Sequence, residues 1–370
     1  MMGLGLYIHV PFCMGKCPYC DFYSVTPGEE AVDGYIKRTL ELIAEYGRDC
    51  AEEVSTVYFG GGTPGLLGAK RLGELLEGIL RSFPVAGGAE ITCELNPAGL
   101  EAGFFRELKS AGFNRLSMGM QSADEGELRM LGRRHGPRDV ERSVELARAA
   151  GFGNISLDLM LALPGSSSES LQESIDFAAR LSPEHISAYI LKIEPGTPFA
   201  SQGLQLPDDD SAADQYLLTV ERLSRLGYSQ YEISNFSRPG YESRHNLCYW
   251  QCGEYLGLGP AAHSFYKGRR FHWERDLNGY LRGEAPADDG PGGGTGEFAM
   301  LNLRLSRGLI ERECVLRFGG DGGKMFSRVR ERALSLPGAL IAAGPGKVAF
   351  TPEGFLVSNA LLSRLLEGMI

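Results

Sequence analysis

The stretch that decides the fold begins with Leu4-Gly-Leu-Tyr-Ile-His-Val10 and continues into Pro11-Phe-Cys13-Met-Gly-Lys-Cys17-Pro-Tyr-Cys20. An apolar run of strand length leads into a loop with three cysteines spaced C-x3-C-x2-C. Because at most two of three such thiols can pair as a disulfide, the spacing indicates a metal centre. A tetrahedral zinc ion would need a fourth ligand, for which only His9 lies near in the sequence, whereas a 4Fe-4S cluster can leave its fourth iron open. We therefore predict a cluster on this loop, with zinc or three unrelated thiols as the alternatives.

Composition limits the class of protein. The 370 residues are 43% hydrophobic and 23% charged, which is ordinary for a globular protein with a large core. The formal net charge of −10 does not suggest a nucleic-acid partner. The chain lacks a basic leader and any apolar stretch near about 18 residues, so we expect no transmembrane segment and a cytoplasmic location with reduced thiols.

Strand-like runs alternate with amphipathic helical segments along the first half of the chain. The expected strands are 4–10, 55–59, 90–94, 114–118, 154–158 and 185–190. The expected helices are 29–49, 69–82, 101–110, 124–150 and 168–180. This alternation predicts βαβ units and a parallel sheet. With six units, we expect an α/β partial (β/α)6 barrel rather than a closed eightfold one.

Special residues follow the ends of five different predicted strands. They are Cys13, the turn 60–63, Glu94, Gln121 and Asp158. In parallel α/β sheets, the carboxyl ends of the strands form the rim where binding sites are assembled. We therefore expect these positions to converge on one mouth.

Each motif at this rim has a chemical use and a plainer explanation. Gly60-Gly-Gly-Thr63 lets the backbone approach a ligand closely, but by itself it would usually be a tight turn. A carboxylate such as Glu94 can bond an ammonium group or ribose hydroxyls, or can partner a helix N-terminus. Arg133 offers a fork for a carboxylate, and Asp158 can hold a ribose.

Composition divides the chain into four regions. We expect a barrel over 1–200 and a barrel-associated segment over 201–282. The Gly-, Pro- and Asp-rich stretch 283–296 reads as a linker. The last region, 297–370, is predicted to be a small helical or winged-helix-like domain.

Several motifs together resemble one known family. Tyr7-Ile-His-Val-Pro-Phe-Cys13, Tyr58-Phe-Gly-Gly-Gly-Thr-Pro64 and Ser117-Met-Gly-Met-Gln121 are similar to segments of radical S-adenosylmethionine (SAM) proteins of the oxygen-independent coproporphyrinogen III oxidase family. The resemblance implies a 4Fe-4S cluster on Cys13, Cys17 and Cys20. It also implies SAM contacts at Tyr7, Gly61, Gly62, Thr63, Glu94, Gln121, Arg133 and Asp158, with another near Leu191 or Lys192.

Two features favour the heme-binding branch of this family over the oxidases. Oxidases carry a fourth cysteine where this chain has Phe22, and they have a long N-terminal extension, whereas here 12 residues precede Cys13. In addition, His245-Asn-Leu-Cys-Tyr249 matches the H-N-x-x-Y motif of the heme-binding branch. His245 and Tyr249 are therefore expected at a heme, with Cys248 as a rival iron ligand, although that thiol is more readily explained as a buried structural one.

The resemblance thus implies a heme chaperone. Such a protein would need a heme acceptor, which the sequence does not identify, and an electron donor for its cluster. Two alternatives stay open, namely a coproporphyrinogen III oxidase and a related radical SAM methyltransferase. Whether the chain is itself an enzyme is left open by these motifs.

Overall fold

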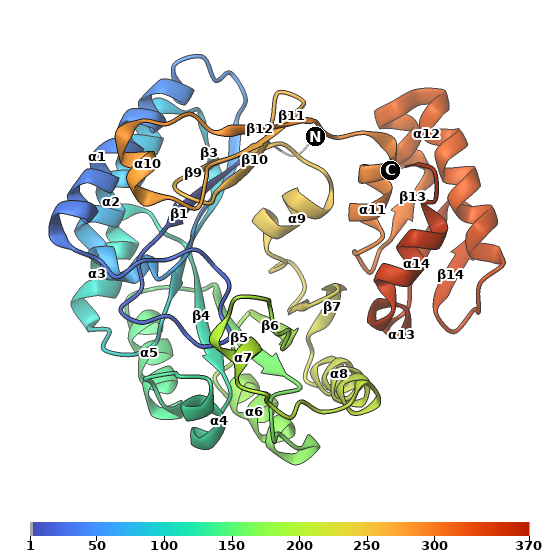
Figure 1. The fold of residues 1–370 in the computed structure, drawn as a ribbon, viewed down its shortest axis with the longest axis horizontal. Coiled ribbons are helices and arrows are strands. Elements are labelled where there is room, and N and C mark those ends of the chain that lie inside the picture. Colours follow the sequence, from blue (N-terminus) through green and yellow to red (C-terminus); the bar gives the residue numbers. More distant parts are fainter. Residues whose placement is uncertain (1–2, 370) are drawn as a thin grey trace.

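The computed structural model describes residues 3–369, and a parallel six-stranded sheet lies at its centre (Figure 1). The strands lie in the sheet in chain order, and each pairs in parallel with the next. They are β1 (Leu4–Val10), β2 (Val54–Gly61), β3 (Val85–Leu95), β4 (Arg115–Gln121), β5 (Ile155–Leu161) and β6 (His185–Ile190). Nearly every residue of β1 and β5 is buried, as expected when both faces of a parallel sheet are covered.

Helices connect these strands and pack along the outside of the sheet (Figure 1). They are α1 (Glu29–Gly47), the short 3-10 helix η1 (Pro64–Leu67), α2 (Gly68–Ser82), α3 (Ala102–Ala111), α4 (Glu125–Met130), α5 (Pro137–Ala149) and α6 (Ser168–Arg180). In α2, the buried residues Leu72, Leu75, Leu76 and Ile79 recur at helical spacing. The expected alternation of strands and helices is confirmed.

The sheet continues beyond both ends of the six parallel strands. On one side, β8 (Asn235–Ser237) pairs antiparallel with β6, and β7 (Ser229–Glu232) pairs antiparallel with β8. On the other side, β9 (Tyr255–Leu258) runs parallel to β1, and three further strands follow, each pairing antiparallel with the one before it. These are β10 (His263–Tyr266), β11 (Arg269–His272) and β12 (Ala287–Pro291). Because β12 and β7 end the twelve-stranded order without pairing to each other, the barrel is open, and the predicted partial barrel is confirmed.

The segment after β6 contributes four helices and corrects one expectation. The helices are α7 (Pro198–Ser201), α8 (Asp209–Arg225), α9 (Arg244–Trp250) and α10 (Leu277–Arg282). The stretch 283–296, expected to be a linker, contains β12, which pairs with β11. An edge strand tolerates Gly and Pro because one side of its backbone needs no partner strand, so composition alone misled the prediction. The other region boundaries stay predictions.

The C-terminal part combines helices with a small antiparallel sheet in the order β13-β15-β14. Its elements are α11 (Thr295–Asn302), β13 (Leu309–Ile310), α12 (Glu311–Leu334), β14 (Ile341–Gly344), β15 (Lys347–Phe350), α13 (Pro352–Leu356) and α14 (Ser358–Leu365). Gly319 breaks α12 into two helices, because its φ of 59° and ψ of −134° are not helical. The expected small helical part is confirmed. Within residues 3–369, every helix is too short or too polar to cross a lipid bilayer.

Candidate functional site

A cavity of about 390 Å³ lies at the carboxyl ends of the parallel strands. We call it the cysteine cavity, because all three cysteines of the loop line it. Most of the other residues expected at a SAM site line it too, namely Gly61, Gly62, Thr63, Glu94, Gln121, Arg133 and Asp158. Parallel strands in sequential order bring these positions together, because all six strands end on the same side of the sheet.

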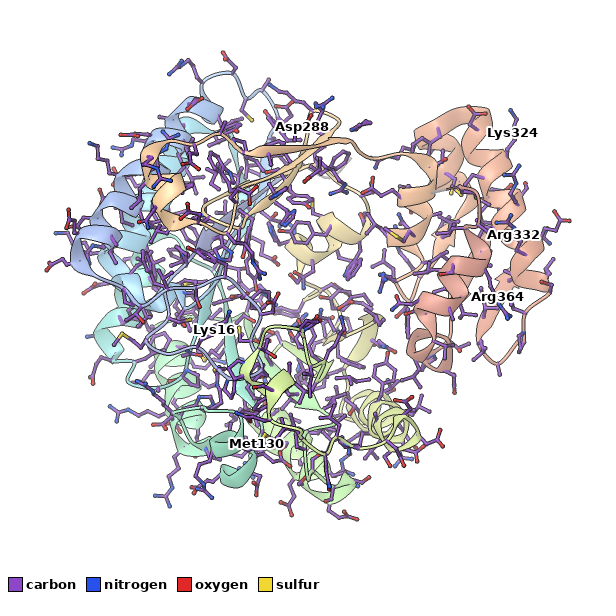
Figure 2. The ribbon with its side chains drawn as sticks, in the orientation of Figure 1. Lys16, Met130, Asp288, Lys324, Arg332 and Arg364 are labelled. Carbon is purple, nitrogen blue, oxygen red and sulfur yellow. The ribbon has the colours of Figure 1, made fainter. Side chains whose placement is uncertain are left out.

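The cysteine loop is held in place by backbone hydrogen bonds. The amide of Cys13 donates to the carbonyl of Val25 at 3.0 Å, and that of Cys20 donates to the carbonyl of Cys17 at 3.0 Å. Lys16 of this loop is labelled in Figure 2. The Cys13 sulfur lies 3.4 Å from the Thr63 hydroxyl, and burial raises the pKa of the Cys20 thiol.

A zinc ion on the three loop thiols would need a fourth ligand, for which His9 was the candidate. Both ring nitrogens of His9 are engaged, with the Tyr7 hydroxyl and the Tyr23 carbonyl at 3.0 Å each. A 4Fe-4S cluster needs only the three thiolates, because its fourth iron can stay open.

The glycine turn after β2 lies directly against the cysteine loop. The amides of Gly62 and Thr63 donate to the carbonyls of Val10 and Phe12, each at 2.8 Å. A Cβ on Gly62 would lie 2.6 Å from the Phe12 oxygen, so only glycine fits there. The amide of Gly61 donates to Glu94 at 3.2 Å. These three amides therefore hold the loop and Glu94, instead of facing a ligand as the sequence suggested.

Two partly buried carboxyl groups face the cysteine cavity. Glu94 accepts a hydrogen bond from the Tyr58 hydroxyl at 2.7 Å, and burial raises its pKa to about 7. Asp158 accepts one from the Ser117 hydroxyl at 3.3 Å, and burial raises its pKa as well. Carboxyls with raised pKa values that face a cavity are candidates for a functional site.

Gln121 at the end of β4 and Arg133 in the segment after α4 both line the cavity. The Arg133 guanidinium donates to the Asn96 side chain and the Gly119 carbonyl at 2.7 Å each, and it lies 3.8 Å from the Cys17 sulfur. Gln121 ends β4 with a φ of 69°, which is unusual outside glycine. Such backbone strain is concentrated at functional positions.

Tyr7 and the contact expected at Leu191 or Lys192 do not line the cysteine cavity. The side chain of Lys192 is 78% exposed and pairs with Glu194 at 2.6 Å. The neighbouring Leu191 is buried in an apolar cluster. Tyr7 lines a different cavity and bonds His9 there. Sequence reasoning missed Asn96, which lines the cysteine cavity and bonds both Thr63 and Arg133. Its place two residues after Glu94, at the end of β3, was the available signal.

A second cavity, of about 620 Å³, lies beside the first and is lined by many aromatic and histidine side chains. We call it the aromatic cavity. Phe22, which is 66% exposed, lines both cavities. The aromatic cavity is also lined by Tyr7, Tyr23, Tyr249, Tyr255, Trp273, three histidines and Arg275. It therefore offers aromatic faces beside charged groups, because Asp21 and Glu274 line it as well.

His245 lies behind this cavity and is almost fully buried. Its Nδ1 is 2.8 Å from the Thr56 hydroxyl, and its Nε2 is 2.7 Å from the Tyr249 hydroxyl. Burial lowers the pKa of His245 to about 3, with Arg115 adding to the effect, so the imidazole is neutral at physiological pH.

The rival ligand, Cys248, is also inaccessible. Its thiol is fully buried and donates to the carbonyl of Glu254 at 3.4 Å. Burial raises the pKa of Cys248 to about 12, so the thiol stays protonated. The structure therefore gives this cysteine the surroundings of a packing residue.

Comparison with known proteins points to one family. The model of the radical SAM superfamily matches residues 7–178. The heme chaperone HemW of Escherichia coli (strain K12) is 41% identical over 316 residues, which cover 82% of each chain. HemW of Bacillus subtilis (strain 168) is 40% identical over 376 residues, which cover 97% of this chain and 98% of that one.

A solved structure shares the fold over nearly the whole chain. Coproporphyrinogen III oxidase (HemN) from Escherichia coli, a radical SAM enzyme, aligns with a TM-score of 0.84 and covers 98% of this chain and 90% of its own. Its sequence identity of 22% restricts this likeness to the fold.

Proposed function

Because this chain belongs to the HemW family of radical SAM proteins, we propose that it binds heme and passes it to an acceptor protein. The observation that carries this proposal is the aromatic cavity, which adjoins the cysteine cavity at Phe22 and includes Tyr249 of the H-N-x-x-Y motif. Its volume of about 620 Å³ suits a flat macrocycle. The rings along its wall supply the apolar faces that a porphyrin needs.

His245 is the proposed iron ligand. The Thr56 hydroxyl fixes one ring nitrogen and leaves Nε2 directed at Tyr249, which lines the cavity. A hydrogen bond to the ring nitrogen that does not bind the metal orients metal-binding histidines in general. Heme binding then requires the Tyr249 hydroxyl to leave Nε2. Because the imidazole is neutral, no proton has to be lost first.

The cysteine cavity is the proposed place of the 4Fe-4S cluster and SAM. Cys13, Cys17 and Cys20 would hold the cluster, and Glu94, Gln121, Arg133 and Asp158 with the turn 61–63 would surround SAM. When bound, this pair of cofactors supplies one-electron chemistry. The carboxyls of Glu94 and Asp158, which line this cavity, would bond the polar groups of SAM. An electron donor for the cluster and a heme acceptor are the protein partners in this proposal.

The oxidase alternative has weaker support at the residue level. Phe22 stands where the resembling oxidases carry a further cysteine, and its side chain lies at the junction of the two cavities. The likeness to HemN is a likeness of fold. We therefore keep the chaperone as the proposed function.

Heme titration of the cluster-loaded protein under anaerobic conditions tests the proposal. We expect about one heme per chain. His245→Ala should weaken binding at least about tenfold or shift the Soret band, because the iron loses its axial nitrogen. Cys248→Ser should change neither the affinity nor the spectrum.

A conservative variant guards against a folding defect. His245→Gln keeps a side chain that can bond Thr56 but removes the imidazole, and thermal melting reports whether each variant is folded. Unchanged heme affinity and an unchanged spectrum in a folded His245 variant would contradict the proposed ligand.

A further inference from the structure

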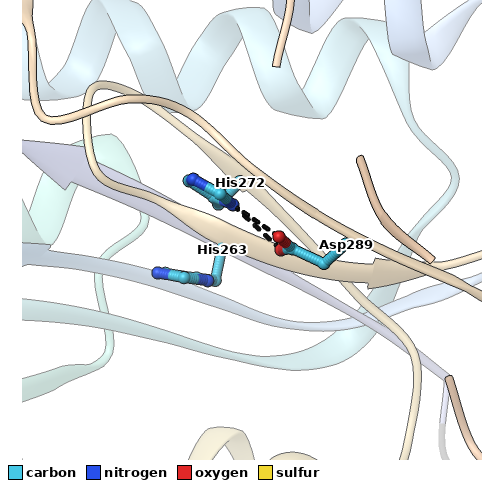
Figure 3. A group of neighbouring side chains, drawn as sticks. All are labelled: His263, His272 and Asp289. Atoms are coloured by element: carbon cyan, nitrogen blue, oxygen red, sulfur yellow. Dashed lines mark hydrogen bonds and ion pairs between the residues drawn. The ribbon is translucent and has the colours of Figure 1, made fainter. Parts of the chain in front are cut away.

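Three side chains from neighbouring strands meet beside the aromatic cavity. Figure 3 shows His263 on β10, His272 on β11 and Asp289 on β12. Each offers one metal-binding atom, and these atoms all lie within 4.8 Å of one another. Among residues 3–369, no other group of three His, Cys, Asp or Glu side chains meets this condition.

The register of the sheet explains why they meet. His263 and His272 are directly opposite each other on antiparallel strands, and their rings stack with centroids 5.1 Å apart. The register between β11 and β12 shifts after Arg270, so that Gly290 pairs with Arg270 and Asp288 pairs with Phe271. Asp289 is the extra residue of this bulge, and a bulge redirects a side chain. Here the Asp289 carboxylate reaches His272.

The hydrogen bonds of these side chains do not engage all the nitrogen and oxygen atoms that could bind a metal ion. Nδ1 of His272 lies 2.9 and 3.0 Å from the two oxygens of Asp289. The His263 ring is exposed to solvent and lines the aromatic cavity. Among the described residues it has no hydrogen-bond partner, so both of its nitrogens are available. Glu274 adds a carboxylate oxygen 3.8 Å from Nε2 of His272. The two imidazoles thus lie beside the carboxylates of Asp289 and Glu274, with the guanidinium groups of Arg270 and Arg275 also near His263.

We propose that His263, His272 and Asp289 form a site for a divalent transition-metal ion of the zinc type. Two histidines and one carboxylate are a ligand set that zinc uses when it keeps a further position open. Borderline ions with imidazole ligands are favoured over Mg²⁺ or Ca²⁺, which prefer oxygen ligands only. This site shares no residue with the proposed cluster ligands, while His263 and His272 also line the aromatic cavity proposed for heme.

Zn²⁺ titration of the full chain tests the site. The protein is loaded with its cluster before the titration, so that the three loop thiols do not compete for zinc, and it is prepared without an affinity tag. We expect one Zn²⁺ per chain by calorimetry. His272→Ala and Asp289→Ala should each raise the dissociation constant at least about tenfold. The matched control is Asp288→Ala, the adjacent carboxylate, which pairs with Arg269 instead and should leave Zn²⁺ binding unchanged.

A third variant keeps the test decisive if those two are poorly folded. His263→Ala removes a solvent-exposed side chain, and it should abolish the visible absorption of bound Co²⁺, which serves as a coloured substitute for Zn²⁺. Absent Zn²⁺ binding, or equal binding in the native chain and the His263 and His272 variants, would overturn the site.

Heme titration of Asp289→Ala, whose side chain does not line the aromatic cavity, separates the two proposals. Lost Zn²⁺ binding with unchanged heme binding supports a metal site of its own. Reduced heme binding in His263→Ala, in a chain that takes up no Zn²⁺, would overturn the metal site and assign this histidine to heme.

Discussion

At the scale of single residues, the three loop cysteines differ sharply from the other five. Cys13, Cys17 and Cys20 are partly exposed and line one cavity. Four of the others are buried, and Cys50 lies away from the cavity with its thiol near Glu52. Only the loop thiols are both accessible and grouped, as a metal centre requires.

The first prediction at this scale follows from that grouping. Cys17→Ala should abolish the binding of iron and sulfide after anaerobic reconstitution, because two thiolates cannot hold the cube. Chemical analysis of iron and sulfide measures the loss. Cys50→Ala, which removes a thiol outside the cavity, is the control and should keep the full complement. Equal losses in the two variants would mean that the loop is not the cluster site.

At the scale of elements, the turn after β2 fixes the cysteine loop. The amides of Gly62 and Thr63 bond the backbone of the segment 10–12, which leads into Cys13. The glycine turn therefore positions the loop in addition to lining the cavity. The same turn therefore holds both the cysteine loop and Glu94, because the Gly61 amide also donates a hydrogen bond to Glu94.

Gly62→Ala should disturb this arrangement. The added Cβ would lie 2.6 Å from the Phe12 oxygen and 2.8 Å from the Val10 oxygen, so backbone must move. We expect a loss of about 1–3 kcal/mol in the free energy of unfolding and weaker cluster retention. Urea unfolding and iron analysis measure the two effects.

The control is Gly103→Ala in α3, where a Cβ meets nothing within 4 Å. Alanine there should raise the stability by up to about 1 kcal/mol, because it favours the helix. A Gly62 variant as stable and as rich in iron as the Gly103 variant would rule out the proposed role of the turn.

At the scale of the whole molecule, one hydrophobic core runs from the barrel into the C-terminal part. Figure 1 shows that part beside the segment that carries α8 and α9, and α13 contacts α8 while α11 contacts α9. Arg317 of α12 bridges the two regions, because its guanidinium donates to the Cys252 carbonyl at 2.8 Å and lies over the Phe298 ring.

Arg317→Ala should therefore lower the free energy of unfolding by about 1 kcal/mol, the usual net worth of one such hydrogen bond. Arg328→Ala, on the exposed side of the same helix, should change it by less than about 0.5 kcal/mol. Denaturant unfolding compares the two. Equal effects would show that the bridge contributes nothing to the joining of the two regions.

The sequence by itself determined the partial barrel, the cysteine loop and most of the residues that line the cavity at the carboxyl ends of the strands. Strand and helix periods are local patterns, and parallel strands in chain order place their ends on one side. For that reason the sequence alone predicts that Glu94, Gln121 and Asp158 lie close together. The cysteine spacing is local as well, so it needed no knowledge of the tertiary structure.

Only the tertiary structure decided which atoms are available. It assigned the amides of the glycine turn to the cysteine loop, placed Tyr7 in the aromatic cavity and left Lys192 in solvent. It also made a strand of the expected linker, whose bulge brings Asp289 to His272. These outcomes depend on register and on contacts between residues far apart in the chain. No local pattern specifies them, because each is set by the packing of one element against another.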